Sequence, residues 1–315
     1  MPLAYGFVDY GGPDVQRFLD ISVPEPEAGE VLVAVEAAGV NPVDWKVRAG
    51  MQRAFLPLRL PAVLGREVAG TVVRTGPGIS GLAAGDRVFG STVGGSGGYA
   101  EFALVPAERA ARLPDGVSVT DAAALPIAAG TAHDGLADLR LAAGETLLIL
   151  GVGGGVGTVA AQLAVMSGVA VVGTASEAKR AFAESLGAAP VAYDRGDVAG
   201  RLKDLLPAGA DAVLDLVGGD ALHGVAGVIT ARTRVLTVAD EETRGHFGAH
   251  PLTRVGDTAT LSALAELVAA GRLKPYVHRV FPFAEAGDAL ALVESGHASG
   301  KVVIDTTGGV TDGRR

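Results

Sequence analysis

Short apolar segments separated by glycine and proline fill the first third of the chain. Val31–Ala37, Val68–Thr75 and Tyr99–Val105 are rich in β-branched and small apolar residues, and turn residues follow them at irregular spacing. Breaks such as Pro24-Glu25-Pro26 and the run from Gly94 to Gly98 are typical of turns between strands. This pattern predicts a β-rich, partly open barrel.

From about Asp121 the pattern changes to strands and helices in alternation. Such alternation predicts a doubly wound parallel sheet with helices on its faces, and therefore an α/β fold. The expected elements are Thr146–Leu150, Gly157–Met166, Ala170–Thr174, Lys179–Leu186, Ala212–Leu216, Arg234–Val238 and Leu261–Ala270.

After Gly271 the sequence predicts a strand, a helix and a final strand, at Tyr276–Phe281, Glu285–Glu294 and Lys301–Asp305. We expect these elements to rejoin the β-rich part. The predicted domains are residues 1–120 with 272–315, and residues 121–271. The polar, Gly-rich end from residue 308 is expected to be a frayed tail.

One stretch resembles a membrane span, because no charged residue lies between Glu145 and Glu177. Five glycines between Gly151 and Gly157 divide this stretch into an apolar segment, a turn and an Ala-rich segment. The division is typical of a buried parallel strand followed by a helix. We therefore expect no membrane-spanning segment here and no membrane partner.

Composition narrows the classes of partner. The formal net charge is −9 over 315 residues, and the basic residues form no stripe, which argues against nucleic-acid binding. The chain has no cysteine, so it has neither disulfides nor thiolate metal ligands. Residues 1–20 lack the basic-then-apolar order of a secretory signal, and we expect a cytoplasmic protein.

The strongest local signal is a glycine-rich turn, Leu150-Gly151-Val152-Gly153-Gly154-Gly155-Val156-Gly157, after a predicted strand and before a predicted helix. Glycine allows the backbone to turn sharply and to approach a pyrophosphate with no Cβ in the way. The helix N-terminus supplies N–H groups and the positive end of its dipole. A tight turn without a ligand is the alternative, but the strand–turn–helix–strand context favours dinucleotide binding.

The end of the next predicted strand bears on the choice of cofactor. NAD enzymes usually place Asp or Glu there to bind the ribose hydroxyls, whereas this chain has Thr174-Ala175-Ser176. Lys179 and Arg180 follow, and cations pair strongly with phosphate oxygens. This arrangement favours NADPH. The alternative is that both cations only cover an exposed helix face, and Glu177 adds weight to that alternative.

Several segments together resemble the zinc-free quinone oxidoreductase branch, which includes the zeta-crystallin-like proteins, of the medium-chain dehydrogenase/reductase superfamily. The resemblance covers nearly the whole chain and implies a GroES-like catalytic domain beside a Rossmann domain. Each matching segment is common by itself, but the order and spacing of the segments are specific to this family. The matching segments are Ala38-Gly39-Val40-Asn41-Pro42-Val43-Asp44, Gly65-Arg66-Glu67-Val68-Ala69-Gly70, Gly85-Asp86-Arg87-Val88, Gly97-Gly98-Tyr99-Ala100-Glu101, Ala123-Ala124-Leu125-Pro126, Gly130-Thr131-Ala132, Leu186-Gly187-Ala188 and Gly300-Lys301-Val302-Val303.

The resemblance also implies a reaction. Where zinc alcohol dehydrogenases of this superfamily have metal ligands, this chain has Asn41, Arg66 and Ile127, which are not a zinc ligand set. Without a Lewis acid the natural acceptors are quinones and enones, because hydride addition spreads negative charge onto an oxygen. The implied activity is NADPH-dependent reduction of a small quinone or enone, with no bound metal, by a homodimer.

Residues at the adenosine and phosphate end follow from the same resemblance. Gly153, Gly154, Gly155 and Val156 match the family's pyrophosphate turn. Ser176 and Lys179 are the implied contacts of the 2′-phosphate, and Tyr193 is the implied contact near the adenosine; Arg180 is added as a cofactor contact because of its charge.

Residues at the nicotinamide end are implied as well. Asn41 matches an Asn beside the nicotinamide, Thr131 matches a Thr behind its ring, and Lys301 matches a late Lys near the cofactor. Many members have a Tyr five residues after the Asn, but this chain has Lys46, which either donates a proton or is a solvated surface lysine. Glu67 is implied to lie under the active site, paired with Arg66 or in another buried ion pair.

Other functions stay open at this point. A zinc-free alcohol or aldehyde dehydrogenase-like reductase and a non-catalytic, NADPH-binding redox sensor would share the same turn. No Gly-x-Ser-x-Gly elbow follows a strand, which disfavours a serine hydrolase. His246 and His250 are one helical turn apart and could bind a metal, although no HExxH pattern accompanies them.

Overall fold

The computed structural model describes residues 1–230, 232–238, 245, 247, 249–252 and 254–308. The chain forms two compact units, Met1–Ala128 with Gly256–Arg315, and Ala129–Val255. The second unit is shorter at both ends than the expected segment 121–271. At one end helix α2 (Val119–Ala123) packs on the sheet of the first unit. At the other end Thr258 Oγ1, at the start of helix α9 (Thr258–Ala269), donates to Ala107 O (3.2 Å) and Ala110 O (3.1 Å).

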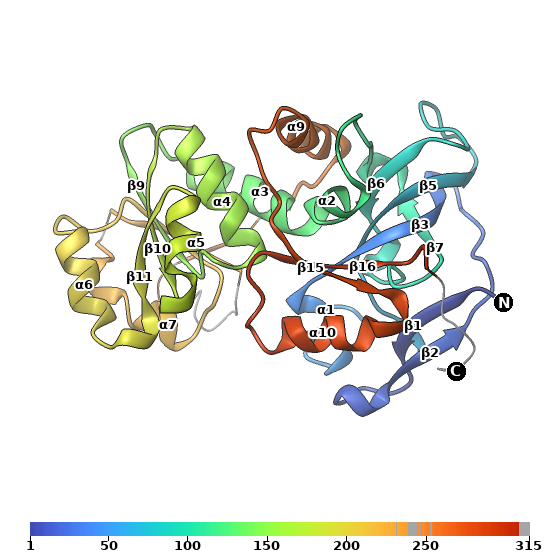
Figure 1. Ribbon diagram of the computed structural model, residues 1–315, viewed down its shortest axis with the longest axis horizontal. Helices are drawn as coiled ribbons and strands as arrows, with labels where there is room; N and C mark the ends of the chain where they lie inside the picture. Colours follow the sequence, from blue (N-terminus) through green and yellow to red (C-terminus); the bar gives the residue numbers. More distant parts are fainter. Residues whose placement is uncertain (231, 239–244, 246, 248, 253, 309–315) are drawn as a thin grey trace. The chain divides into compact units, whose positions relative to one another are not determined.

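A seven-stranded sheet forms the centre of the first unit (Figure 1). Its described order is β15-β16-β3-β5-β6-β8, and β7 also pairs with β3. The strands are β3 (Glu30–Val40), β5 (Glu67–Thr75), β6 (Arg87–Ser91), β7 (Phe102–Pro106), β8 (Ala110–Arg112), β15 (Val277–Pro282) and β16 (Lys301–Asp305). Strand β16 pairs antiparallel with β3, and Val302 lies opposite Val40. This pairing brings the start of β16 to the end of β3.

A smaller sheet, β2-β1-β4, packs beside the first one. Within this sheet the ring centroids of Tyr5 and Phe18 lie 5.0 Å apart. The Phe18 ring also lies 5.4 Å from the ring of Phe283, in the 3-10 turn Phe283–Glu285, so aromatic contacts connect the sheet to this turn. Phe283 is fully buried, and burial of a side chain of this size contributes roughly 1.5–3 kcal/mol. The remaining elements of this unit are β1 (Leu3–Phe7), β2 (Gln16–Asp20), β4 (Ala62–Val63), α1 (Pro42–Arg48) and α10 (Ala286–Glu294).

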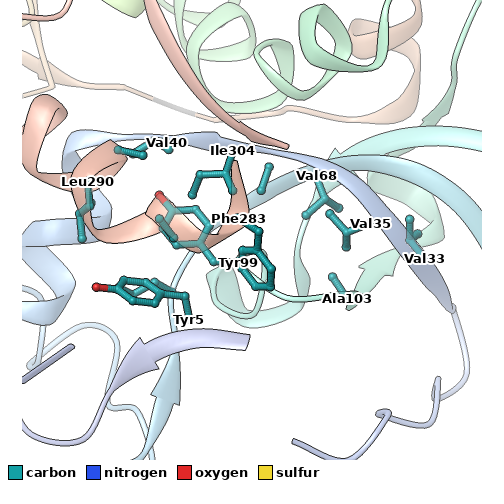
Figure 2. Close-up of a cluster of buried hydrophobic side chains, with 14 of the residues drawn as sticks. Tyr5, Val33, Val35, Val40, Val68, Tyr99, Ala103, Phe283, Leu290 and Ile304 are labelled. Atoms are coloured by element: carbon teal, nitrogen blue, oxygen red, sulfur yellow. The ribbon is translucent and has the colours of Figure 1, made fainter. Parts of the chain in front are cut away.

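The core of the first unit collects side chains from segments far apart in the sequence. Figure 2 shows Val33, Val35 and Val40 of β3, Val68 of β5, Ala103 of β7 and Ile304 of β16 together with Tyr5, Tyr99, Phe283 and Leu290.

Six described strands form the parallel sheet of the second unit, in the order β11-β10-β9-β12-β13-β14. The chain runs outward from β9 to β11 and then returns to β12 on the other side of β9, so a topological switch point lies between β9 and β12. The strands are β9 (Thr146–Leu150), β10 (Ala170–Ala175), β11 (Ala188–Ala192), β12 (Ala212–Asp215), β13 (Arg234–Thr237) and β14 (His250–Pro251). The α-helices among the described residues of this unit are α3 (Gly130–Leu139), α4 (Gly155–Met166), α5 (Arg180–Ser185), α6 (Val198–Leu205) and α7 (Asp220–His223).

The predicted fold class is confirmed, because the second unit contains a doubly wound parallel sheet and the first unit is rich in β-strands. The uncharged stretch between Glu145 and Glu177 forms β9, α4 and β10, with β9 buried in the middle of its sheet. Among the described residues, no helix is long and apolar enough to cross a membrane.

Candidate active site and dinucleotide site

The glycine-rich turn connects β9 to α4 at the switch point. Gly151 has φ +84°, and its N–H donates to Thr174 Oγ1 of β10 at 3.1 Å. A Cβ on Gly157 would lie 2.7 Å from Val152 Cα and 2.8 Å from Val152 O, which are backbone atoms that cannot move aside. The fold therefore requires glycine at 151 for its conformation and at 157 for close packing of α4 on the turn.

Gly154 is different, because the fold does not require a glycine there. Its φ is −89° and its ψ is 175°, which any residue adopts, and an added Cβ would meet only Gly151 O at 3.4 Å. Gly154 is also the N-cap of α4, a position where Ser, Thr, Asn or Asp would stabilise the helix. Because Gly154 has no side chain, there is room beside the N–H groups of α4. A dinucleotide pyrophosphate would need this room to approach those N–H groups.

Lys179 lies beside this turn. Its Cδ is 3.0 Å from the position that a Cβ would take on Gly153, so the aliphatic part of the lysine covers the glycine. Burial lowers the pKa of Lys179. Ser176, the N-cap of the short 3-10 turn Glu177–Lys179, is partly buried and makes no side-chain cap bond. The predicted phosphate turn and one of the predicted cations are thus neighbours.

Arg180 is held by an acidic neighbour. Its Nε donates to Glu177 Oε1 at 2.9 Å and its Nη2 donates to Glu177 Oε2 at 3.2 Å, and this pairing lowers the pKa of Glu177. A residue that the sequence analysis missed, Arg195, also approaches Glu177 Oε2, at 3.9 Å. Tyr193 follows β11 and its side chain is 60% exposed. This region therefore carries two arginines beside three carboxylates, since Glu184 lies 4.0 Å from Arg180 Nη1 and Asp194 Oδ1 accepts from Glu177 N at 2.9 Å.

A buried polar network in the first unit surrounds Asn41, and we call it the Asn41 network. Asn41 Nδ2 donates to Glu67 Oε1 at 2.7 Å, and Asn41 Oδ1 accepts from Lys301 Nζ at 2.7 Å. Lys301 Nζ also donates to Glu67 Oε1 (2.7 Å) and to Val40 O (2.9 Å). Glu67 Oε2 accepts from Ile127 N at 2.6 Å. Both ends of the Asn41 amide are thereby fixed, with its oxygen toward the cation and its nitrogen toward the anion.

The expected pairing of Glu67 with Arg66 is wrong. The ion-pair partner of Glu67 is Lys301, whose side chain is 3% exposed against 0% for Glu67. Arg66 lies in the bend before β5, and its guanidinium packs against Gly95 instead of pairing with the Glu67 carboxylate. The alternative, a buried ion pair, is confirmed. The contact of Lys301 with a cofactor stays a prediction, and all three ammonium donors of this lysine are already engaged.

Asp44 is a buried carboxylate that the sequence analysis did not single out. Its Oδ2 accepts from Asn41 N at 2.8 Å and from the Tyr99 hydroxyl at 2.7 Å, while its Oδ1 has no hydrogen-bond partner among the described residues. Burial raises the pKa of Asp44 to about 6, against the lowering effect of these two hydrogen bonds. The local signal was present, because Asn41 and Asp44 form the N-cap and N3 pair of a capping box.

Replacing Asp44 with asparagine should remove a pH dependence of stability. The folded pKa, about 6, lies above the ordinary value of 3.8, so the folded state binds more protons between these values. The free energy of unfolding of the wild type should therefore fall, relative to the variant, by roughly 2–3 kcal/mol as pH rises from about 4 to about 6. Urea unfolding across this window measures the difference. Asp115→Asn, at an exposed position, is the control, and parallel curves for wild type and Asp44→Asn would contradict the prediction.

Thr131 and Lys46 are placed in different surroundings. Thr131 is buried on α3, where its Oγ1 accepts from Arg254 Nη1 at 2.6 Å. Arg254 Nε also lies 3.3 Å from Asp134 Oδ2, so this arginine, which the sequence analysis missed, spans the first turn of α3. Lys46 is partly buried on α1, with its Nζ 5.8 Å from the centroid of the Trp45 ring. Thr131 belongs to the second unit, whereas Lys46 and Asn41 belong to the first.

Comparison with known proteins agrees with this architecture. Residues 27–115 match the alcohol dehydrogenase GroES-like domain, and residues 186–304 match the zinc-binding dehydrogenase family. A chloroplast envelope quinone oxidoreductase homolog of Arabidopsis thaliana is 32% identical over 94% of this chain and 95% of its own length. An NADPH-dependent alkenal/one oxidoreductase, chloroplastic, of the same plant is 34% identical over 96% of this chain and 78% of its own length.

The chain belongs to the quinone oxidoreductase branch of the medium-chain dehydrogenase/reductase superfamily. Among solved structures, a quinone oxidoreductase from Coxiella burnetii matches with a TM-score of 0.89 at 30% identity, over 97% of this chain and 99% of the other. The resemblance inferred from the sequence is thereby confirmed.

In the present chain, Asn41, Arg66 and Ile127 stand at the positions that resemble the zinc-ligand positions of zinc alcohol dehydrogenases. The part of the chain that the structure describes contains no cluster of three or more His, Asp or Glu side chains arranged to hold a metal. Of the two histidines considered as a metal pair, His246 lies outside the described residues and His250 lies on β14.

Proposed function

We propose that this protein reduces quinones or the activated C=C bonds of enones with NADPH, by hydride transfer without zinc. The observation that carries the proposal is the combination of two features. The glycine-rich turn has a glycine at 154 that the fold does not require, and the positions resembling zinc ligands hold Asn, Arg and Ile. The names of the two plant relatives, a quinone oxidoreductase homolog and an NADPH-dependent alkenal/one oxidoreductase, support it.

The residues of the second unit fit a phosphorylated dinucleotide. The N-terminus of the 12-residue helix α4 offers N–H groups beside glycines, and no Asp or Glu stands at 174–176. When bound, NADPH would supply a hydride. The residues that we propose to hold it are Gly153, Gly154, Gly155 and Val156 at the pyrophosphate, with Ser176, Lys179, Arg180 and Tyr193 toward the 2′-phosphate and adenosine.

The first unit would orient the reacting groups. Asn41 is suited to this role because both ends of its amide are fixed by charged partners, which keeps it from rotating. We propose that Asn41 and Thr131 position the nicotinamide ring, and that Lys46 or a water supplies the proton. Activated acceptors are favoured because the charge left by hydride addition is delocalised onto oxygen.

Transfer of label from NADPH deuterated at C4 tests the function. We expect deuterium on the β-carbon of an enone by mass spectrometry, and no labelling of a simple ketone. The same assay with NADH should need roughly ten to a hundred times more cofactor, the equivalent of one charge-assisted contact to the 2′-phosphate.

Two other outcomes of this assay would replace the proposal. Rapid labelling of the ketone, with no enone or quinone turnover, would indicate an alcohol or aldehyde reductase. Tight NADPH binding with no turnover of any acceptor would indicate a redox sensor. The cytoplasmic location and the homodimer expected from the sequence stay predictions.

A further inference from the structure

Arg66 has an environment that sets it apart from the other described arginines. Its side chain is partly buried, yet its guanidinium has no hydrogen-bond, ion-pair or aromatic partner among the described residues. The other described arginines are either exposed or engaged, as Arg48 is with Glu294 and Arg254 with Asp134. A partly desolvated guanidinium without an anion is costly, and such a group is suited to bind one.

The guanidinium packs against the loop that follows β6. The position that a Cβ would take on Gly95 lies 2.8 Å from Arg66 Nε and 2.9 Å from Arg66 Cζ, so the guanidinium lies directly on the backbone of this loop. Gly95 also has φ +66°, a conformation that favours glycine. Backbone hydrogen bonds hold this loop to the segment before β5, from Thr92 N to Arg66 O (2.9 Å), from Gly97 N to Val63 O (3.2 Å) and from Gly98 N to Gly65 O (3.0 Å).

Of the two cations next to Glu67, Lys301 in space and Arg66 in sequence, only Arg66 has N–H donors available for a ligand. Lys301 is neutralised by Glu67 and has all three donors engaged, so it has no N–H left for a substrate oxygen. Arg66 directly precedes Glu67, whose carboxylate accepts from the Asn41 amide. An uncompensated guanidinium therefore lies directly before the strand that supports Asn41.

We propose that Arg66 is a catalytic residue that binds the oxyanion formed during reduction. The inference rests on the proposed function. Hydride adds to the β-carbon of the enone, the C=C electron pair moves toward the carbonyl, and the enolate oxygen carries the negative charge opposite Arg66. A proton then adds to the α-carbon and restores the carbonyl. For a quinone, the same charge lies on a hydroquinone oxygen before protonation. Stabilisation of developing charge by a fixed donor is a large catalytic term.

A stable phenolate tests the site without turnover. We would titrate the protein, in the presence of NADP⁺, with 4-nitrophenol and follow the phenolate absorbance as a function of pH. Binding to wild type should lower the apparent pKa of the phenol. Arg66→Gln should weaken phenolate binding at least about tenfold, the equivalent of one charge-assisted hydrogen bond, and leave binding of uncharged 4-nitroanisole unchanged. Arg66→Lys should retain part of the effect. Arg59→Gln, at an exposed arginine of the same unit, is the matched control.

Kinetic measurements complete the test. Arg66→Gln should lower kcat for enones and quinones by roughly a hundred-fold, the scale of one lost oxyanion donor, with the NADPH dissociation constant unchanged. Equal loss of phenolate and 4-nitroanisole binding would overturn the proposal, as would weaker NADPH binding with phenolate binding intact. If no enone or quinone is reduced but phenolate binding still depends on Arg66, the proposed function fails and the oxyanion site stands.

Discussion

Replacing Lys301 with methionine should destabilise the protein by about 3–5 kcal/mol, the cost of leaving a buried charge without its partner. Methionine fills a similar volume but leaves the Glu67 carboxylate, 0% exposed, facing only the Asn41 amide and the Ile127 amide. Glu67→Gln should have a similar cost, because it leaves the Lys301 ammonium buried beside a neutral group. The double variant Glu67→Gln/Lys301→Met removes both charges and should recover most of the lost stability.

Denaturant unfolding of the four proteins measures this coupling, with Lys203→Met as a control at an exposed lysine of the second unit. The control should change the free energy of unfolding by no more than about 0.5 kcal/mol. The double variant also separates stability from function. It should fold but turn over slowly, because the Asn41 amide would no longer have a charge on each side to fix its orientation. If the stability loss of the double variant equals the sum of the losses of the two single variants, the coupling is refuted.

The elements set by local patterns were predicted closely from the sequence. The strand expected at Thr146–Leu150 is β9 to the residue, because a buried apolar run ends there at a glycine with positive φ. The helix expected to start at Gly157 begins at Gly155, since the first turn of α4 is made of the glycines themselves. The final strand expected at Lys301–Asp305 is β16.

Contacts between distant segments were not predictable in the same way. Lys301 and Glu67 are 234 positions apart, and they meet because β16 and β5 both pair with β3. A strand pattern indicates which face is buried but not which strand is the neighbour, so the sequence supported Arg66 as a partner as readily as Lys301. Asp44 could have been found, since its capping box is local, but its burial depends on Tyr99, 55 positions away.

Substitution of two glycines in the glycine-rich turn should separate what the fold requires from what the proposed cofactor requires. Gly157→Ala places a Cβ against the backbone of Val152, 2.7 Å from its Cα, so α4 must move away from the turn. We expect a loss of about 1–3 kcal/mol in the free energy of unfolding together with weaker cofactor binding.

Gly154→Ala should behave in the opposite way with respect to folding. Its Cβ would meet only Gly151 O, at the ordinary distance of 3.4 Å, so the free energy of unfolding should change by no more than about 1 kcal/mol, the cost of alanine at an N-cap. The added methyl group would nevertheless block the close approach of a pyrophosphate to the N–H groups of α4, and we expect NADPH binding to weaken roughly a hundred-fold. Fluorescence titration with NADPH, beside thermal unfolding of both variants, measures the two effects separately. If Gly154→Ala binds NADPH as tightly as the wild type, the phosphates do not lie at this turn, and the dinucleotide site proposed for the second unit is wrong.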